Sequence, residues 1–580
     1  MIEKKLKALI REAVSGAAAD LGAEPPVEIE LIRPPQKRFG DFSTNVAMAW
    51  GARLKRNPGE VAAAIVHQMP KADFLSSAEV APPGFINFHV VHLWLYDVLR
   101  EVVARGDSFG LLDPTGERAQ VEFVSANPTG PLHVGHARNT ALGDAIASIL
   151  EAAGFGVERE YYWNDSGTQM ELLGQSVEAR YLARFGVPAE VPENGYHGEY
   201  VDDVAAQIAE EVGDRFVHEE PEARRKWFVE ESRRRMIEWI RSTLDRFGVH
   251  FDSWFSEAYL EQSGAVEEAV KLLRQKGFAY DADGAVWFRS TEFGDDKDRV
   301  LIRSNGAPTY FAKDVAYLRD KFGRGFDRLV YVWGADHHGD VVRVRGAAQA
   351  LGYDPEAMEF VLYQFVSLYR GGQPVKMSKR AGDLITLDEL LDEVGADAAR
   401  YALLARSSDS PINFDIEEVS RQSLENPVYY VQYAHARIAS IIRHASERGI
   451  DLAPIDSVDL ERLDAEAELD LLRKISELPE EVEVAANLRA PYRLARYVED
   501  LAALFHRFYT ECRVVTDDAA LTQARLWLCV AAKQAIANVL GLLGVSAPEA
   551  MERVDEDTEA TDDSGVTERS GAAEGSGTGA

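Results

Sequence analysis

The sequence predicts an α/β protein with a doubly wound parallel sheet at its centre, a small α+β domain before it and an all-α domain after it. Strand-like and helix-like segments alternate between about residues 116 and 410, which favours a parallel sheet covered by helices. From residue 411 to 552, apolar residues recur at helical spacing almost without interruption, which predicts the all-α domain. A chain of 580 residues has room for three domains.

The predicted sheet domain has two groups of elements. In the first, the run VEFVSANPTG ends in turn residues, residues 136–153 show helical spacing up to Gly154, and residues 157–163 form the next strand. The second group consists of helix 312–321, strand 328–333, helix 341–351 and strand 360–369. The charged segment between the groups, at about residues 175–299, is predicted to be an insertion into the sheet domain.

The two ends of the chain differ in composition from its middle. The first 115 residues predict the α+β domain, with an opening amphipathic helix, a second helix over residues 46–66 and a closing strand over residues 84–90. The last segment, residues 553–580, is acidic, rich in Gly and Ser, and lacks aromatic residues. That composition predicts a disordered acidic tail.

Charge and cysteine content limit the possible functions. The chain has 96 acidic against 63 basic residues, a formal net charge of −33, which by itself argues against a nucleic-acid partner. Excess carboxylates with mostly Arg as the basic residue also fit a salt-adapted cytosol, and net charge does not determine a site. Cys512 and Cys529 are too few for a disulfide framework or a cysteine-based metal site, so we expect no structural metal.

The chain shows no targeting or membrane signal. No apolar run reaches the roughly 18 residues of a membrane-spanning helix. The N-terminal segment MIEKKLKALIREAV lacks the apolar core and the cleavage site of a signal peptide. We therefore expect a cytoplasmic protein without a membrane partner.

The segment PLHVGHARNTALGDA places His133, Gly135 and His136 at a predicted strand-to-helix turn. The N–H groups and the positive dipole end of a helix N-terminus favour phosphate. A glycine there admits a purine ring, and imidazoles stabilise charge that grows on phosphoryl oxygens in a transition state. A pair of solvated or core histidines would explain an isolated HVGH equally well, so a second motif has to decide.

The second motif is KMSKR, residues 376–380, in a loop that follows the Gly/Pro segment GGQPV. Lys376 and Lys379 on such a loop could clamp a triphosphate and then the departing pyrophosphate. Alone, the motif fits an exposed basic loop as well. The order of HVGH and KMSKR and their wide separation favour the catalytic interpretation.

Together these motifs resemble the HIGH and KMSKS signatures of class I aminoacyl-tRNA synthetases. Residues 1–551 are similar to arginyl-tRNA synthetases in the segments GDFSTNVAM, PGFINF, EFVSANP, YYWND, FGDDKDRVLIRSNGAPTYFAKDVAY, YVWGADHHGDV and NPVYYVQYAHARI. The resemblance implies a Rossmann-type catalytic domain, an additional N-terminal domain at the tRNA elbow, and an anticodon-binding helical domain.

The resemblance also implies an arginine site. Glu122, Tyr310 and Asp314 would recognise the guanidinium, which suits bidentate acceptors. Tyr310 and Asp314 are four residues apart on a predicted helix, hence on one face. The other implied arginine contacts are Ser125 and Asn127 at the amino-acid end, and His337 where some members carry Gln.

ATP with Mg²⁺ is the second implied substrate. The implied catalytic residues are His133, His136, Lys376 and Lys379, and the implied ATP-binding residues are Gly135, Gly334, Val366 and Met377. Members that lack the second KMSK lysine tend to carry a lysine just ahead of HVGH. This chain has none in the stretch TGPL and keeps KMSKR complete, so we expect Lys379 to carry the phosphate charge.

The implied reaction is the ATP-dependent formation of arginyl-adenylate, followed by transfer of the arginyl group to the terminal ribose of tRNA(Arg). Family members usually need bound tRNA for the first step and are usually monomers. The residues expected to contact tRNA are Lys37, Arg38 and Phe39 in the N-terminal domain and Tyr429, Tyr430, Tyr433 and Arg437 in the helical domain.

Two alternatives stay open at this point. The chain could be another class I synthetase or a nucleotidyltransferase that acts on small molecules, although a full helical C-terminal domain argues against the latter. It could also be a tRNA-binding paralogue without activity, although intact HVGH and KMSKR motifs argue against a decayed site.

Overall fold

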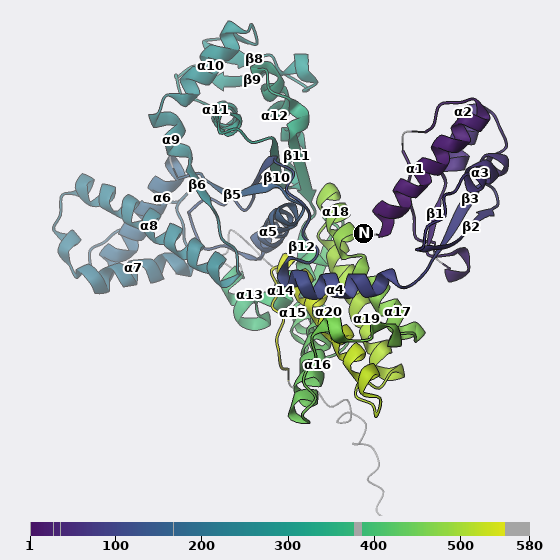
Figure 1. The fold of residues 1–580 in the computed structure, drawn as a ribbon. Coiled ribbons are helices and arrows are strands. Elements are labelled where there is room, and N and C mark those ends of the chain that lie inside the picture. The colour runs from purple at the N-terminus through teal and green to yellow at the C-terminus, as the bar shows by residue number, and fades with distance from the viewer. Residues whose placement is uncertain (1, 27, 35, 166, 376–384, 552–580) are drawn as a thin grey trace, which may run out of the picture.

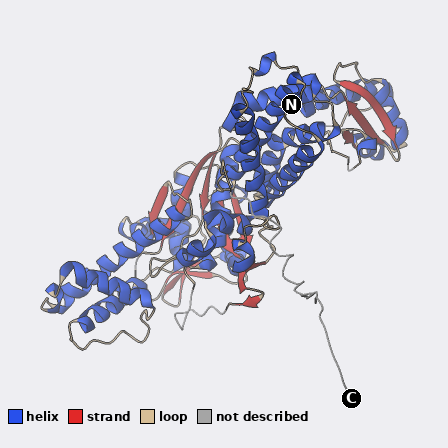
Figure 2. Ribbon diagram, turned by 90° about the horizontal axis from the view of Figure 1, so that it is seen from below, coloured by secondary structure: helices blue, strands red, loops and turns tan. Residues whose placement is uncertain are grey.

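The computed structural model describes residues 2–26, 28–34, 36–165, 167–375 and 385–551. Figure 1 shows a central sheet region with helices α6 to α8 extending from one side, the N-terminal domain on the other side, and a helical region below. In Figure 2 the molecule is elongated, with the N-terminal sheet and the extended helices near opposite ends. None of the helices in the described ranges is long and apolar enough to cross a membrane.

The central sheet confirms the prediction of a doubly wound parallel sheet. Its strands pair in the order β11-β10-β4-β5-β6, and every neighbouring pair is parallel. These strands are β4 (Arg118–Glu122), β5 (Gly156–Trp163), β6 (Ser253–Ser256), β10 (Arg328–Gly334) and β11 (Met358–Tyr363). The chain winds outward from β4 toward β6 and later from β10 toward β11. The direction of winding therefore reverses between β4 and β10, and sheets of this kind bind ligands at the carboxyl ends of such strands.

Alternating side chains divide the two faces of the sheet between different helices. Val330 and Val332 of β10 belong to the apolar core that contains α5 (Val134–Ala152). Leu329 and Tyr331 belong to the core that contains α11 (Tyr310–Gly323) and α12 (His338–Leu351). Helix α5 thus covers one face, and α11 with α12 covers the other, as the period of two along a strand requires.

Two elements predicted as single units are divided in the structure. The helix expected over residues 46–66 is two helices, α2 (Val46–Leu54) and α3 (Pro58–His67). Pro58 lacks an N–H group and starts the second helix, while the side chain of Asn57 accepts the N–H of Gly59 at 2.8 Å.

The strand expected over residues 360–369 is likewise divided. Strand β11 ends at Tyr363, and β12 (Val366–Arg370) pairs instead with β13 (Gln373–Pro374) and β14 (Ile412–Asp415). Between them, the carbonyl of Gln364 accepts the guanidinium of Arg138 at 2.6 Å. The backbone groups at the break therefore bond outside the central sheet.

The segment expected to be one insertion, residues 175–299, is interrupted by a strand of the main sheet. Helices α6 (Thr168–Arg184), α7 (Glu199–Val212) and α8 (Pro221–Arg246) pack around a separate apolar core. Strand β6 then returns to pair with β5. After it come α9 (Glu257–Gln262), α10 (Ala265–Gln275) and the antiparallel strands β7 (Ala279–Ala282), β8 (Ala285–Phe288) and β9 (Arg299–Ile302).

The C-terminal half of the chain is helical from residue 387 onward, apart from the short strand β14. Its longer helices are α13 (Leu387–Val394), α14 (Ala396–Leu404), α16 (Pro427–Glu447), α17 (Glu466–Ser476), α18 (Leu478–Leu488), α19 (Tyr492–Glu511) and α20 (Ala519–Leu542), with the five-residue α15 (Ile416–Ser420) after β14. Helix α4 (Trp94–Arg105) packs against α17 and α20, and the hydroxyl of Tyr96 donates to the carbonyl of Leu463 at 2.9 Å.

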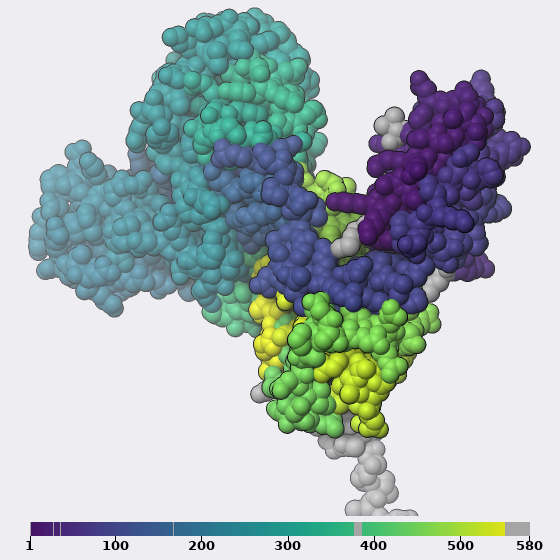
Figure 3. All heavy atoms as spheres, viewed as in Figure 1, coloured from purple at the N-terminus to yellow at the C-terminus, as the bar shows by residue number. Residues whose placement is uncertain are grey.

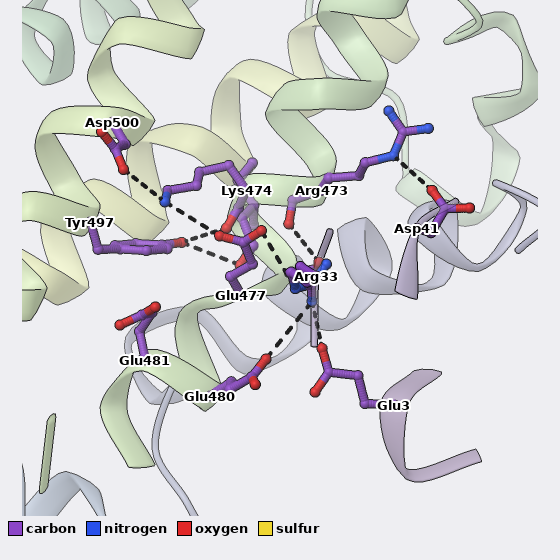
Figure 4. Close-up of polar contacts among 12 residues, drawn as sticks. Glu3, Arg33, Asp41, Arg473, Lys474, Glu477, Glu480, Glu481, Tyr497 and Asp500 are labelled. Carbon is purple, nitrogen blue, oxygen red and sulfur yellow. Dashed lines mark hydrogen bonds and ion pairs between the residues drawn. The ribbon is translucent and has the colours of Figure 1, made fainter. Parts of the chain in front are cut away.

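The N-terminal domain consists of α1 (Ile2–Leu21), α2, α3 and the antiparallel sheet β1-β3-β2, where β1 is Phe42–Thr44, β2 Leu75–Ala81 and β3 Phe85–Val90. Charged side chains join it to the helical region (Figure 4). Arg33 lies 3.6 Å from Glu477 and Arg473 lies 3.6 Å from Asp41, while the pair of Arg33 with Glu3, at 2.7 Å, stays within the N-terminal domain. These groups keep contact with water, so each pair contributes about 1 kcal/mol or less.

Close packing between α5 and the end of β4 gives a test of the fold. A Cβ atom on Gly143 would lie 2.2 Å from Cγ of Phe123, which is buried. Gly143→Ala should therefore lower the free energy of unfolding by about 1–3 kcal/mol. Gly541→Ala in α20 meets nothing within 4 Å and should leave stability unchanged or raise it by ~0.4–1 kcal/mol. Thermal unfolding of both variants measures the difference, and equal midpoints would contradict the packing.

Candidate active site

The HVGH segment forms the N-terminus of α5 and is fixed to a distant part of the chain. The N–H of Val134 donates to the carbonyl of Ile385 at 3.2 Å, and the N–H of Leu387 donates to the carbonyl of Leu132 at 2.8 Å. His133 and Thr386 thus form an antiparallel bridge. Ile385 lies five positions after Arg380, the last residue of the KMSKR stretch. Lys376, Met377 and Lys379 themselves lie outside the described residues.

The two histidines are oriented by backbone N–H groups. Nδ1 of His133 accepts the N–H of Gly135 at 3.1 Å, and Nδ1 of His136 accepts the N–H of His133 at 3.2 Å. Their ring centroids are 3.9 Å apart. Because each Nδ1 acts as an acceptor, a neutral ring carries its proton on Nε2 and offers a donor there. The arrangement can present two N–H donors to phosphate oxygens beside a helix N-terminus.

Gly135 and Gly334 are sites where a side chain would displace a neighbour. A Cβ atom on Gly135 would lie 2.8 Å from Cε1 of His133 and would displace the ring from its hydrogen bond with the N–H of Gly135. A Cβ atom on Gly334, the last residue of β10, would lie 2.4 Å from Oδ1 of Asp336. Val366, also expected at the ATP site, is half-buried at the start of β12.

The turn after β4 has an unusual backbone. Val124 has φ +64° and Ser125 has φ +43°, in the left-handed region that a β-branched residue such as Val rarely adopts. The side chain of Asn139 accepts the N–H of Val124 at 2.6 Å and donates to the carbonyl of Val332 at 2.9 Å. The Tyr161 hydroxyl donates to the carbonyl of Ala126 and accepts its N–H. Strained backbone held by buried partners is typical of functional sites.

Asn139 and Tyr161 are therefore positioning residues that were absent from the sequence prediction. Asn139 is 6% exposed on α5, and Tyr161 is fully buried in β5. A signal was present in the sequence, because Asn139 is a polar residue inside an apolar helix pattern. Such a residue needs hydrogen-bond partners when it is buried.

Three residues expected to bind arginine follow one another around this turn. Glu122 ends β4, and the hydroxyl of Ser125 donates to its Oε1 at 3.3 Å. The same hydroxyl accepts the N–H of Tyr162 at 3.2 Å. Asn127 donates to Oε1 of Gln169 at 2.8 Å. Glu122 also forms an ion pair with Nζ of Lys321, which the sequence did not suggest.

Helix α11 presents a stripe of polar side chains toward the carboxyl ends of β4 and β10. Tyr310, Asp314, Tyr317 and Lys321 recur at helical spacing, which confirms that Tyr310 and Asp314 share one face. Tyr310 is 61% exposed and Asp314 is exposed, whereas Tyr317 and Lys321 are buried. The stripe therefore runs from an open end into the protein interior.

Asp314 lies in a field of carboxylates. Although its side chain still contacts solvent, the surrounding protein desolvates it, and Glu122, Glu257 and Asp340 repel its charge. Together these effects raise the pKa of Asp314 to about 7, against a partial opposing effect of Arg343. A cation beside Asp314 would relieve this repulsion, so the group is suited to bind one.

His337 lies in the short turn after β10 and is 58% exposed at its side chain. Its Nδ1 is 3.1 Å from the carboxylate of Asp340, one of the groups that acts on Asp314. His337 therefore adjoins the carboxylate field without belonging to its buried part.

The helical region places its four predicted tRNA contacts differently. Tyr429 is buried, and its ring stacks on that of Tyr433 with the ring centroids 6.1 Å apart. Tyr430 is half-buried beside the ring of His506. Tyr433 and Arg437 line a surface cavity of about 330 Å³, and the guanidinium of Arg437 lies 4.4 Å from the ring centroid of Tyr509.

The N-terminal residues expected at the tRNA elbow form a short turn over Lys37–Phe39. Arg38 and Phe39 are exposed, and the guanidinium of Arg38 lies 4.7 Å from the ring centroid of Phe39. No group of three or more His, Cys, Asp or Glu side chains suited to a metal ion occurs in the described part of the chain.

Three family models match successive parts of the chain. Residues 4–90 match the family model "Arginyl tRNA synthetase N terminal domain", residues 106–415 match "tRNA synthetases class I (R), catalytic domain", and residues 431–551 match "DALR anticodon binding domain".

Similar proteins cover nearly the whole chain. The arginine–tRNA ligase of Heliobacterium modesticaldum is 47% identical over 559 residues, which span 95% of this chain and 99% of the relative. The arginine–tRNA ligase of Carboxydothermus hydrogenoformans is 48% identical over 539 residues, 92% of this chain and 96% of the relative. The structure of Thermus thermophilus arginyl-tRNA synthetase has the same fold, with a TM-score of 0.74 at 24% identity, and the match covers 94% of this chain and 100% of that one. The chain therefore belongs to the arginyl-tRNA synthetase family of class I aminoacyl-tRNA synthetases and is an arginine–tRNA ligase.

Proposed function

We propose that the region at the carboxyl ends of β4 and β10 activates L-arginine with Mg-ATP and transfers it to tRNA(Arg). One observation carries the assignment: Asp314 on α11 lies close enough to Glu122, the last residue of β4, for the two charges to repel, and Tyr310 shares its face of the helix. The guanidinium of the substrate arginine would enter the field of carboxylates around Asp314, while the carboxylate of the same arginine would point toward the nucleotide. Ser125, Asn127 and His337 surround this position and would orient the α-amino end.

The nucleotide would lie on the opposite side of the turn. The two Nε2–H groups of His133 and His136 and the N-terminus of α5 would hold the phosphate region. Gly135 and Gly334 would leave room for adenosine, and the strand at Val366 would border the adenine. Mg²⁺ would bind to the phosphates of ATP, where it offsets charge on the leaving group.

The chemistry follows from positioning and charge neutralisation. A carboxylate oxygen of arginine attacks the α-phosphorus of ATP, the bond to the β-phosphate breaks, and pyrophosphate leaves. A hydroxyl of the terminal ribose of tRNA then attacks the carbonyl carbon of arginyl-adenylate, and AMP leaves. The histidine donors would stabilise the charge that grows on the α-phosphate oxygens.

Transfer RNA would contact the N-terminal domain and the helical C-terminal domain. Figure 3 shows a hollow between the N-terminal domain and the sheet domain, above the helical region. We propose that the tRNA elbow reaches Lys37, Arg38 and Phe39, and that an anticodon base enters the cavity at Tyr433 and Arg437 beside Tyr430. In this proposal residues 1–115, 116–410 and 411–552 act as elbow, catalytic and anticodon units of a cytoplasmic monomer.

Arginine binding should depend on the charge of Asp314. Asp314→Asn removes a charged partner of the guanidinium and should raise the KM for arginine by roughly 10- to 100-fold, since such a bond contributes about 1.5–3 kcal/mol. In the unmodified protein, Asp314 has a raised pKa of about 7 and must lose its proton to pair. The KM for arginine should therefore fall as the pH rises from about 6 to 8.

Aminoacylation kinetics over this pH range test the assignment. The Asn variant should show a flat profile of KM against pH in the same range. Asp203→Asn, an exposed change on α7, is the control and should keep the original KM and profile. An unchanged arginine KM in Asp314→Asn would remove Asp314 from the site.

The second KMSKR lysine should carry the phosphate charge. Lys379→Ala should abolish arginine-dependent exchange between ATP and pyrophosphate, measured with tRNA(Arg) present, because no lysine precedes HVGH to compensate. Lys271→Ala, an exposed change on α10, should leave exchange intact. Near-normal exchange in the Lys379 variant would refute this role.

We also propose that the protein is adapted to concentrated salt, with its excess carboxylates on the outer surface and basic residues kept along the tRNA path. The support is the net charge of −33. Aminoacylation should persist or rise up to about 1 M KCl, where charges are screened beyond ~3 Å. Loss of activity just above ordinary ionic strength would contradict the adaptation.

A further inference from the structure

A buried ammonium group lies directly behind the arginine site. The side chain of Lys321, on α11, is 1% exposed and forms an ion pair with Glu122. Its Nζ lies 4.4 Å from the ring centroid of Tyr317 and 4.1 Å from that of Tyr331. Two aromatic faces and one carboxylate thus enclose the ammonium group.

This ion pair changes what Glu122 can offer a substrate. One oxygen of Glu122 binds Lys321, and the other accepts the hydroxyl of Ser125 at 3.3 Å. The charge of Glu122 is therefore partly offset before any ligand arrives, although Glu122 still repels Asp314. Asp314 precedes Tyr317 by about one helical turn and lies on the same face of α11. It has no hydrogen bond or ion pair with another described residue. It is the carboxylate of the stripe that is available to a cation.

We propose that Lys321 is a positioning residue for arginine recognition: it fixes Glu122 at the end of β4 and offsets part of its charge, so that Asp314 can ionise and pair with the guanidinium. This inference rests on the proposed arginine site. It assigns the two carboxylates different tasks, since Glu122 shapes the site through a fixed acceptor and Asp314 pairs with the guanidinium.

The balance of charges explains why the arginine site needs the ammonium group of Lys321. Without Lys321, the buried charge of Glu122 would act on Asp314 unopposed, and Asp314 would hold its proton to a higher pH. Arginine would then have to displace that proton to bind. The other groups that act on Asp314 are Glu257 from α9, Asp340 and Arg343 from α12, and Tyr162 from β5. The charged groups near Lys321 besides Glu122 are Glu160 from β5 and Asp320 and Arg324 from α11.

Four proteins separate the two charges: the unmodified chain, Lys321→Met, Glu122→Gln and the double variant. Binding of L-arginine is measured by titration calorimetry between about pH 5.5 and 9, and the pH at which the Kd changes most steeply is compared. That midpoint should be lowest in Glu122→Gln, which keeps an unopposed ammonium, and highest in Lys321→Met. The unmodified chain and the double variant should lie between them. The extremes should differ by about one pH unit or more, the size expected for one nearby charge.

A structural role alone would predict a different result. It would weaken arginine binding in Lys321→Met at every pH without moving the midpoint, and that outcome would overturn the proposal. Lys321→Arg, which keeps the charge, should restore the original midpoint. Lys271→Met, which removes an exposed lysine of α10, should leave midpoint and affinity unchanged.

Folding is checked by thermal unfolding, because a buried carboxylate that has lost its partner is strongly destabilising. If Lys321→Met does not fold, Glu122→Gln and the double variant still differ only in Lys321, and equal midpoints in these two would overturn the proposal. In Asp314→Asn the pH dependence should vanish. If the pH dependence persists in Asp314→Asn, the assignment of Asp314 is overturned, and the proposal with it. If it vanishes there, but Glu122→Gln and the double variant have equal midpoints, only the role of Lys321 is overturned.

Discussion

The turn at the end of β4 is the constraint on which both halves of the active site depend. Its left-handed residues, Val124 and Ser125, turn the chain from the sheet toward α5. Asn139 and Tyr161 hold that turn through hydrogen bonds to its backbone, and Asn139 also reaches the end of β10. Because Glu122 precedes the turn and His133 follows it, one strained segment sets the spacing between the acidic region and the N-terminus of α5.

The second constraint is electrostatic. A site for a cationic amino acid beside a polyphosphate has to place negative and positive groups a few ångströms apart without collapse into internal ion pairs. The structure separates them by layers. The carboxylates lie on the α11 side of the sheet with Lys321 buried behind them, and the imidazoles stand at the helix that covers the other face. The carboxylates and the imidazoles are therefore held apart on opposite sides of the sheet.

Local signals in the sequence predicted much of the fold and part of the site. Spacing placed Tyr310 and Asp314 on one face, and strand–turn–helix order placed HVGH at a helix N-terminus. Contacts between distant residues were not predictable in this way. The pairing of Glu122 with Lys321 spans 199 positions, and nothing near either residue indicates the other. Strand β6 was missed for the same reason, since its four residues give no periodic pattern and pair only through the tertiary fold.

Helix α4 determines where this protein can be divided. Although it follows the N-terminal sheet in the chain, its buried residues Leu95, Leu99 and Val102 belong to the core shared with α17 and α20. Removal of the chain up to the end of β3 would delete a domain that is joined to the helical region by partly exposed ion pairs. A truncation that also removed α4 would expose the apolar residues of α17 and α20 on which α4 packs. A shortened enzyme should therefore begin before Trp94, and an isolated C-terminal unit would need α4 supplied as a separate peptide.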